Sequence, residues 1–422
     1  MHLRLAAVLT AALVLAGAST PAFATPGSTP STPAPSGFVP VSPVRVLDTR
    51  ANYQNCGWTS TLSENSFTDV DLAACAGHMP PTPYFTVPAG ATAVVVNVTA
   101  TNASANSYLS IGAPGLQTQG SPPAFSTLNV SPGHDVANLV TVPVGPDQHG
   151  NPGADLTVYN HAGSVDIVLD VLGYYMTPSQ TQTTYRYTPT QPARVLDTRQ
   201  QVPLGPQTQR AVQLNSVPGI PTDAAALVVN LTATDASTKG FLTVAPASGG
   251  YTTSTVNYEP GKDVSNQAIV PLSTSSGGSI AVYNNAGSVD AVLDVVGYYS
   301  AGGQGLFTPV PPSRVLDTRT GAGPIGPDST LPLAVAGHGG VPAGAIGAVL
   351  NLTATQETQP SHLTVWPDGQ PTPGTSSLNT NPSSDIANHV QTQLGPDGAV
   401  DIYNHAGSTQ VIADVYGYFT AS

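Results

Sequence analysis

The hexapeptide Arg-Val-Leu-Asp-Thr-Arg occurs three times in the chain, at residues 45–50, 194–199 and 314–319. Three further blocks follow each copy in the same order: an apolar run containing Asn-x-Thr-Ala-Thr, a segment of the form Asp-x-x-Asn, and a final run ending in Gly-Tyr-Tyr or Gly-Tyr-Phe. Self-similarity over such a long period indicates a repeat architecture. The sequence therefore predicts three copies of one folded unit.

Within a copy, short runs rich in Val, Leu, Ile, Thr and Tyr are separated by Gly, Pro, Asn and Ser, which is typical of strands joined by turns. In the second copy we expect extended runs near residues 194–197, 210–214, 225–234, 241–245, 253–258, 267–272, 279–283 and 289–299. About eight strands in a unit of ~115 residues are typical of a sandwich or jelly roll. The predicted fold class is therefore all-β, with three tandem antiparallel β-sandwich domains of the jelly-roll kind.

The positions of the motifs predict the boundaries of the repeats. We expect the first β module at residues 37–176, the second at 185–300 and the third at 306–422, joined by polar linkers. The first copy is longer than the others, and we attribute its extra length to two insertions, at residues 52–83 and 146–153.

The N-terminus has the features of an export signal. Residues 1–24 contain Arg4, an apolar stretch and the small-x-small end Ala22-Phe23-Ala24. A Thr/Pro/Ser-rich linker at residues 25–36 follows. No later run approaches the ~18 apolar residues of a membrane span. We expect a secreted protein, extracellular or associated with the cell surface, without membrane insertion. Its only cysteines, Cys56 and Cys75, are expected to form a disulfide there.

The composition argues against several classes of function. Only 8% of the 422 residues are charged and the net charge is -13, so phosphate backbones would be repelled and nucleic acid is not expected as a partner. The sequence contains neither Gly-x-Ser-x-Gly nor His-Glu-x-x-His, and its histidines lack the spacing of metal ligands. We expect no enzymatic activity, no cofactor and no metal.

The four ordered motifs resemble a repeat module of secreted actinobacterial proteins, where the module occurs alone, in tandem or appended to exported enzymes. The resemblance covers nearly the whole mature chain. It implies a module that binds or displays at the cell envelope, and it assigns no catalytic residues. The long Cys-bearing insertion of the first copy departs from the compact form of that module.

The arginines are placed as if each had a fixed partner, because six of the eight that follow the export signal lie in the hexapeptides. Acidic partners are available in the hexapeptide and inside the apolar last strand, where a carboxylate is costly to bury unless it is paired. We expect structural ion pairs that join the first and last strands of each repeat; the alternative is a sugar or Ca²⁺ site built from the same carboxylates. The residues concerned are Arg45, Asp48, Arg50 and Asp170 in the first copy, Arg194, Asp197, Arg199 and Asp294 in the second, and Arg314, Asp317, Arg319 and Asp414 in the third.

Two further repeated pairs are candidates for ligand contacts. Aromatic rings beside amide side chains can stack on sugars and hydrogen-bond to them, although Asn-x-Ala-Gly-Ser is also an ordinary hairpin turn. The short polar residues of the Asp-x-x-Asn segment suit turn hydrogen bonds equally well. The candidate residues are Tyr159, Asn160, Tyr283, Asn284, Tyr403 and Asn404, together with Asp135, Asn138, Asp263, Asn266, Asp385 and Asn388.

We therefore expect a secreted, non-catalytic, multivalent protein that binds carbohydrate or another cell-envelope polymer. The alternative is a structural or adhesion protein, or a component of an extracellular assembly, that contacts other secreted proteins. A binder should show grooves lined by the repeated Tyr/Asn or Asp/Asn residues, whereas a scaffold should expose apolar patches.

Overall fold

The computed structural model describes residues 33–50, 60–73, 86–116, 122–146, 153–213, 217, 219–272, 278–382 and 384–421. All strands lie in one compact unit, Pro33–Ser422. The predicted export signal, most of the linker after it, and Cys56 and Cys75 lie outside the described residues, so secretion and the disulfide stay predictions. In the part of the chain that the structure describes, no helix is long and apolar enough to cross a membrane.

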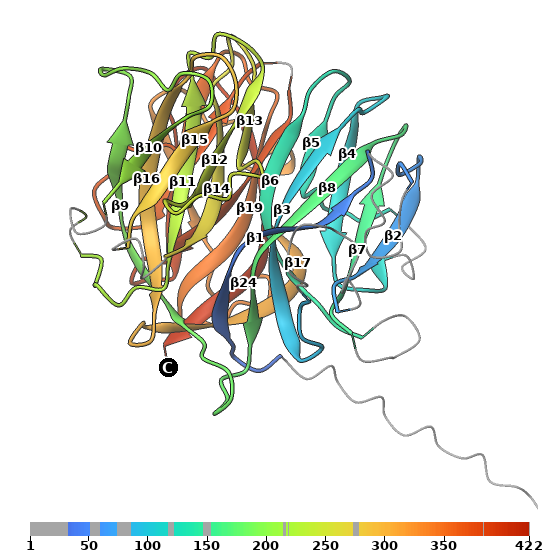
Figure 1. Cartoon of the computed structure of the whole chain (residues 1–422), viewed down its shortest axis with the longest axis vertical. Coiled ribbons are helices and arrows are strands. Elements are labelled where there is room, and N and C mark those ends of the chain that lie inside the picture. The colour runs from blue at the N-terminus through green and yellow to red at the C-terminus, as the bar shows by residue number, and fades with distance from the viewer. Residues whose placement is uncertain are drawn as a thin grey trace, which may run out of the picture. The chain divides into compact units, whose positions relative to one another are not determined.

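Each repeat contributes eight strands, which form two four-stranded antiparallel groups (Figure 1). In the first repeat these are β1 (Gly37–Asp48), β2 (Ser66–Asp71), β3 (Ala91–Thr101), β4 (Ser107–Gly112), β5 (Leu128–Val130), β6 (Val136–Pro143), β7 (Asp155–Asn160) and β8 (Asp166–Met176). In the second they are β9 (Arg186–Asp197), β10 (Thr208–Val212), β11 (Ala226–Thr234), β12 (Gly240–Pro246), β13 (Val256–Tyr258), β14 (Val264–Pro271), β15 (Ile280–Asn284) and β16 (Asp290–Ser300). In the third they are β17 (Gly305–Asp317), β18 (Ser329–Ala334), β19 (Ala345–Thr355), β20 (Ser361–Pro367), β21 (Leu378–Thr380), β22 (Ile386–Gln393), β23 (Ala399–Asn404) and β24 (Gln410–Ala421).

The order of the strands is that of a jelly roll. One sheet of the first repeat runs β1-β8-β3-β6 and the other runs β2-β7-β4-β5, and the other two repeats keep the same order of strands. In those two repeats the sheets that correspond to β1-β8-β3-β6 are joined through β9 and β17 into one eight-stranded sheet. The first strand of each repeat pairs with its last strand, so the hexapeptide and the Gly-Tyr-Tyr block lie side by side. The predicted all-β jelly-roll class is thus confirmed, and each of the eight runs expected in the second copy overlaps a strand.

One predicted insertion is partly wrong. Residues 52–83 contain β2, which pairs with β7 just as β10 pairs with β15 and β18 with β23. The sequence Ser-Phe-Thr-Asp-Val-Asp hides this strand because it has only two apolar residues. The strand therefore belongs to the common fold, and the extra residues of this insertion lie before and after it.

We call β1-β8-β3-β6 and the corresponding sheets of the other two repeats the inner sheets, and their central strands are buried on both faces. All nine residues of β11 are buried, including Asn230 and Thr232. A strand that packs against only one layer would alternate buried and exposed residues. Here the second face is covered by a neighbouring repeat, because the Asn230 Nδ2 donates to the carbonyl of Ser376 at 2.7 Å. The three repeats are therefore packed against one another.

Buried asparagines connect the repeats in a closed ring. The side chain of Asn266 donates to Asn97 Oδ1 and to the carbonyl of Thr255, both at 2.8 Å, and its Oδ1 accepts from the backbone N–H of Leu139 at 3.0 Å. Equivalent side-chain bonds run from Asn138 to Asn351 at 2.9 Å and from Asn388 to Asn230 at 3.4 Å. The second repeat thus bonds to the first, the first to the third and the third to the second.

Residues that differ between the repeats complete this interface. His389 is 2% exposed and lies between Gln267 at 2.9 Å and Thr141 at 3.2 Å, so each repeat supplies one of the three side chains. Burial lowers the pKa of His389 to about 3, and the ring is therefore neutral at physiological pH. The hydroxyl of Tyr299 is within 2.5 Å of that of Tyr175 and also bonds to the side chain of Gln391.

We predict that Asn266→Ala destabilises the whole chain rather than one repeat. The substitution leaves Asn97 Oδ1, the Leu139 N–H and the Thr255 carbonyl without their bond to this side chain, and each unpaired buried group costs about 1–3 kcal/mol. Thermal unfolding should show a loss of roughly 3 kcal/mol in a single transition. Gln200→Ala, at an exposed position, is the control. An unchanged melting temperature for Asn266→Ala would contradict the role given to the ring.

Candidate functional site

Each repeat has one arginine that reaches the buried carboxylate of its last strand. Arg194 on β9 lies opposite Asp294 on β16, with Nε 2.9 Å from Oδ1 and Nη2 3.3 Å from Oδ2. Burial raises the pKa of Asp294, and the arginine opposes this shift. The corresponding pairs are Arg45 with Asp170 and Arg314 with Asp414, each with Nε 3.0 Å from Oδ1. These contacts join the first and last strands.

The second arginine of each hexapeptide has a different partner. Arg199 binds Asp197 with its Nη2 2.6 Å from Oδ2, and the hydrogen bonds from Arg199 lower the pKa of that carboxyl. Arg50 binds Asp48, and Arg319 binds Asp317, both at 2.7 Å. The side chains of these arginines are 40–46% exposed, and they bind within the motif instead of reaching the last strand.

The Asp-x-x-Asn asparagines are unavailable to a ligand. Asn138, Asn266 and Asn388 are at most 1% exposed and bind neighbouring repeats, so their assignment as ligand contacts is corrected. Asp135, Asp263 and Asp385 are exposed at the beginning of the same segments.

The asparagines of the Tyr-Asn pairs hold turns together instead of forming an exposed surface for a sugar ligand. Asn284 is fully buried, and its Nδ2 donates to the carbonyls of Leu204, Gly205 and Gly287, each at 3.0 Å. Asn160 and Asn404 make the equivalent bonds, so all three asparagines are corrected as ligand candidates. The local sequence does not reveal the first two of these bonds, because Leu204 and Gly205 lie about 80 residues before Asn284 in the chain.

The three tyrosines also contact the protein. Tyr159 is fully buried and its hydroxyl donates to Asn65 at 2.9 Å, so it is corrected in the same way. Tyr403 donates to Asp328 at 2.7 Å and is half-buried. Tyr283, also half-buried, stacks on Tyr251 with ring centroids 4.9 Å apart.

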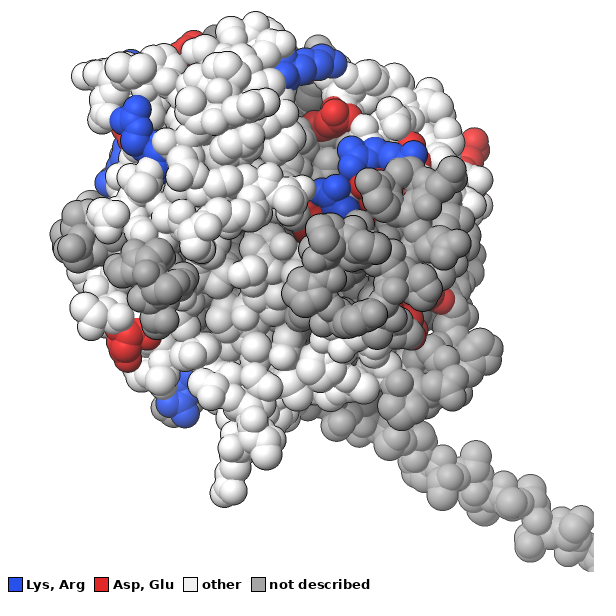
Figure 2. All heavy atoms as spheres, in the orientation of Figure 1, with Lys and Arg blue, Asp and Glu red and all other residues white. Residues whose placement is uncertain are grey.

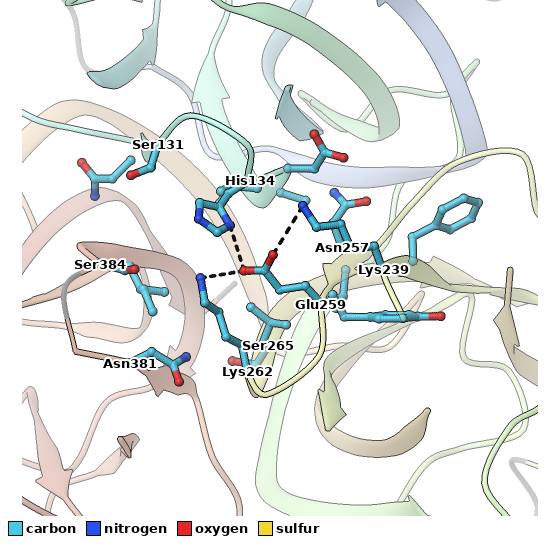
Figure 3. A pocket seen from close by; sticks show the side chains of 18 of the residues that line it. Ser131, His134, Lys239, Asn257, Glu259, Lys262, Ser265, Asn381 and Ser384 are labelled. Atoms are coloured by element: carbon cyan, nitrogen blue, oxygen red, sulfur yellow. Dashed lines mark ion pairs between the residues drawn. The ribbon is translucent and has the colours of Figure 1, made fainter. Parts of the chain in front are cut away.

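The three Asp-x-x-Asn turns surround a cavity of about 330 Å³, which we call the axial pocket (Figure 3). Its lining comes from all three repeats, and Asp135 and Asp385 are part of it. The apolar side chains that line it include Val136, Val264 and Ile386, which occupy equivalent positions in the three copies. This pocket is where the structure gathers accessible polar groups from segments far apart in the chain.

A glutamate bound by three basic side chains forms one wall of the axial pocket. Glu259 Oε1 lies 2.6 Å from Lys262 Nζ and 2.8 Å from His134 Nδ1, and Oε2 lies 3.6 Å from Lys239 Nζ (Figure 3). Burial tends to raise the pKa of Glu259, but the hydrogen bond and charge of Lys262, with His134 and Lys239, lower it overall. Lys239 Nζ also donates to the carbonyl of Gly133 at 2.7 Å, which ties the second repeat to the first.

Sequence reasoning missed this cluster, although the chain held a signal. Lys239 and Lys262 are the only lysines among the 422 residues, and both come from the second repeat. A pair of residues this rare, 23 positions apart within one copy, marks a departure from the threefold pattern. The described residues contain no group of His, Cys, Asp or Glu that could hold a metal ion. The arrangement of amides, hydroxyls and internally paired charges is suited to binding a polar molecule.

A buried carboxyl lies outside this pocket. Glu357 is 8% exposed, and neither of its side-chain oxygens is hydrogen-bonded to another residue. Burial raises its pKa to about 7. The equivalent residues Ala103 and Ala236 are buried, and each follows a residue with positive φ as Glu357 does. The third repeat thus carries an acid where the other two have a methyl group.

Comparisons with known proteins give little similarity. No family model and no curated protein matches the chain. Among solved structures, that of Sulfolobus Turreted Icosahedral Virus is 11% identical, with a TM-score of 0.17, and the match covers 92% of each chain. A structure described as the triple jelly roll fold and turret assembly in an archaeal virus is 10% identical, also with a TM-score of 0.17, and the match covers 91% of each chain. Similarity this low says nothing about function.

We predict that the two arginines of a hexapeptide differ in their effect on stability. Arg194→Ala leaves the buried carboxylate of Asp294 without its partner, which costs about 3–5 kcal/mol. Arg199→Ala removes an exposed pair and should cost less than about 1 kcal/mol. Chemical unfolding of both variants measures the difference, with Arg210→Ala, which lies outside the motif, as the control. Equal losses for Arg194→Ala and Arg199→Ala would overturn this assignment.

We predict that Glu357→Ala stabilises the protein in a pH-dependent way. The folded protein binds the Glu357 proton more tightly than the unfolded chain does, so stability is lost as the pH rises from about 4.5 to about 7. At pH 8 the free energy of unfolding of the variant should exceed that of the parent by roughly 2–3 kcal/mol. The pH-dependent part of this gain should vanish below pH 4.5. Unfolding curves at pH 4 and pH 8 provide the measurement. A gain of the same size at both pH values would contradict the explanation.

Proposed function

We propose that the protein is a secreted, non-catalytic scaffold, a structural or adhesion component that acts by contact with other macromolecules. The supporting observation is the ring of buried asparagines, which makes three repeats one continuous body. The polar residues that recur in every copy hold the protein together. The first arginine of each hexapeptide binds the buried aspartate of the last strand, and the asparagines bind backbone groups and neighbouring repeats.

The contacts of this scaffold are polar. Among the residues that the structure describes, Val202, at 74% exposure, is the one exposed large hydrophobic side chain. The apolar patch expected of a scaffold is thus absent from the described surface. Figure 2 shows few charged side chains on the visible face, with basic and acidic groups lying next to each other. Hydroxyl and amide groups are therefore the main means by which this surface can make contacts.

Carbohydrate binding is a second candidate function, and the axial pocket favours it. The multivalent form of this proposal loses support, because the repeated Asn and Tyr residues expected to form three equivalent sites are wholly or partly enclosed. The pocket is lined by Asn, Ser, His, Lys, Asp and Glu side chains above apolar residues, and it belongs to all three repeats together. A single site per chain takes the place of three.

The scaffold function predicts that the purified mature chain self-associates or sediments with cell-envelope material. Analytical ultracentrifugation over a range of concentrations and electron microscopy should show ordered oligomers or arrays. Asn266→Ala, which loosens the contacts between repeats, should weaken assembly, whereas Gln200→Ala should not. A chain that stays monomeric at every concentration and does not sediment with envelope material would overturn the proposal.

A further inference from the structure

We propose that the axial pocket binds a neutral short saccharide, with one molecule per chain. This inference rests on carbohydrate binding, the second function above, and is independent of the scaffold function. It assigns the ligand to a place where segments of all three repeats meet, near residues 129–137, 239–265 and 381–387.

The first step of the argument concerns charge. The strongest charges of the pocket are engaged with one another, because Glu259 holds Lys262, Lys239 and His134 within 3.6 Å. The remaining carboxylates, Asp135 and Asp385, each accept a hydrogen bond from a threonine hydroxyl. Arg50 and Arg319 interact electrostatically with these two aspartates. With the charges opposed in this way, the pocket has no strong preference for an ionic ligand.

The second step concerns unused hydrogen-bonding groups. Asn129 and Asn257 line the pocket from equivalent positions of the first and second repeats, and the Nδ2 of each is buried without a hydrogen-bond partner. A buried donor without a partner costs free energy, and a hydrogen bond from that donor to a ligand oxygen removes the cost. The carboxylates of Asp135 and Asp385 are acceptors on the same lining. A sugar hydroxyl donates and accepts at once, so it can use an amide donor and a carboxylate acceptor together.

The third step concerns shape and apolar surface. Val136, Val264 and Ile386 give the pocket an apolar contribution from each repeat, and Phe241 and Tyr258 also line it. The C–H faces of a pyranose ring can pack on such residues while its hydroxyls reach the polar groups. A volume of about 330 Å³ is at the lower end of ligand pockets and is suited to a short saccharide rather than a long embedded chain.

The test is calorimetric titration of the mature chain with cellobiose, maltose and di-N-acetylchitobiose at millimolar concentrations. We expect at least one of these to bind with one site per chain and to raise the melting temperature, because the ligand contacts all three repeats. The double variant Asn129→Ala with Asn257→Ala should bind about tenfold more weakly. It removes no Nδ2 hydrogen bond of the free protein, so loss of folding is not expected to obscure the result.

Asn106→Ala is the matched control, since Asn106 is exposed, lies outside the pocket, and occupies in the first repeat the position that Lys239 has in the second. Its affinity should equal that of the parent. Three results would overturn the inference: no binding of any neutral disaccharide, equal binding by the double variant, or tenfold tighter binding of glucosamine or glucuronic acid than of N-acetylglucosamine. If no saccharide binds but the chain assembles, the scaffold function stands alone. If the chain stays monomeric but binds a saccharide, the carbohydrate-binding function is supported and the scaffold function is contradicted.

Discussion

A side-chain amide buried in an interior sheet must be hydrogen-bonded, and in this protein one amide at the centre of each inner sheet depends on another repeat for its partners. Asn97, Asn230 and Asn351 each project from the middle of an inner strand, and each finds its partners in the neighbouring repeat. Because every repeat both provides and requires such bonds, two repeats would leave one end unpaired, whereas three close the ring. The jelly-roll sheets, the fully buried inner strands and the pocket at their meeting point all depend on this closure.

Fusing three copies in one chain permits differences that three identical subunits could not have. The equivalent positions Leu139, Gln267 and His389 carry different side chains, and His389 bonds to Gln267 only because the copies differ. The turns around the axial pocket diverge in the same way: Ser131 and Asn381 occupy the positions that correspond to Glu259. Symmetry therefore supplies the framework, and departures from it give the pocket its particular chemistry.

The sequence could predict features that depend on one repeat alone. The strands follow from runs of β-branched and aromatic residues between turn formers, and the pairing of Arg194 with Asp294 follows from a carboxylate in an apolar strand. The roles of Asn160 and Asn266 could not be read locally, because their partners are distant in sequence or belong to another repeat. One clue was present: Leu-Val-Val-Asn-Leu-Thr-Ala-Thr does not alternate as a strand with one solvent-facing side does. The axial pocket had no local signature, since its lining spans residues 129 to 387.

Repetition of a polar residue is therefore a poor guide to function in a chain built this way. A polar group present in every copy can pair with another repeated group: Asn138 bonds to Asn351 of the third repeat and Asp170 binds Arg45 of its own repeat, and both are buried as a result. A polar group present in only one copy has no such symmetric partner, so its presence needs another cause. Glu259 with its two lysines forms part of a pocket wall, whereas Glu357 is buried without a partner from another residue and lowers the stability of the fold as it ionises. For fused repeats, the polar residues that break the pattern are the first places to search for chemistry.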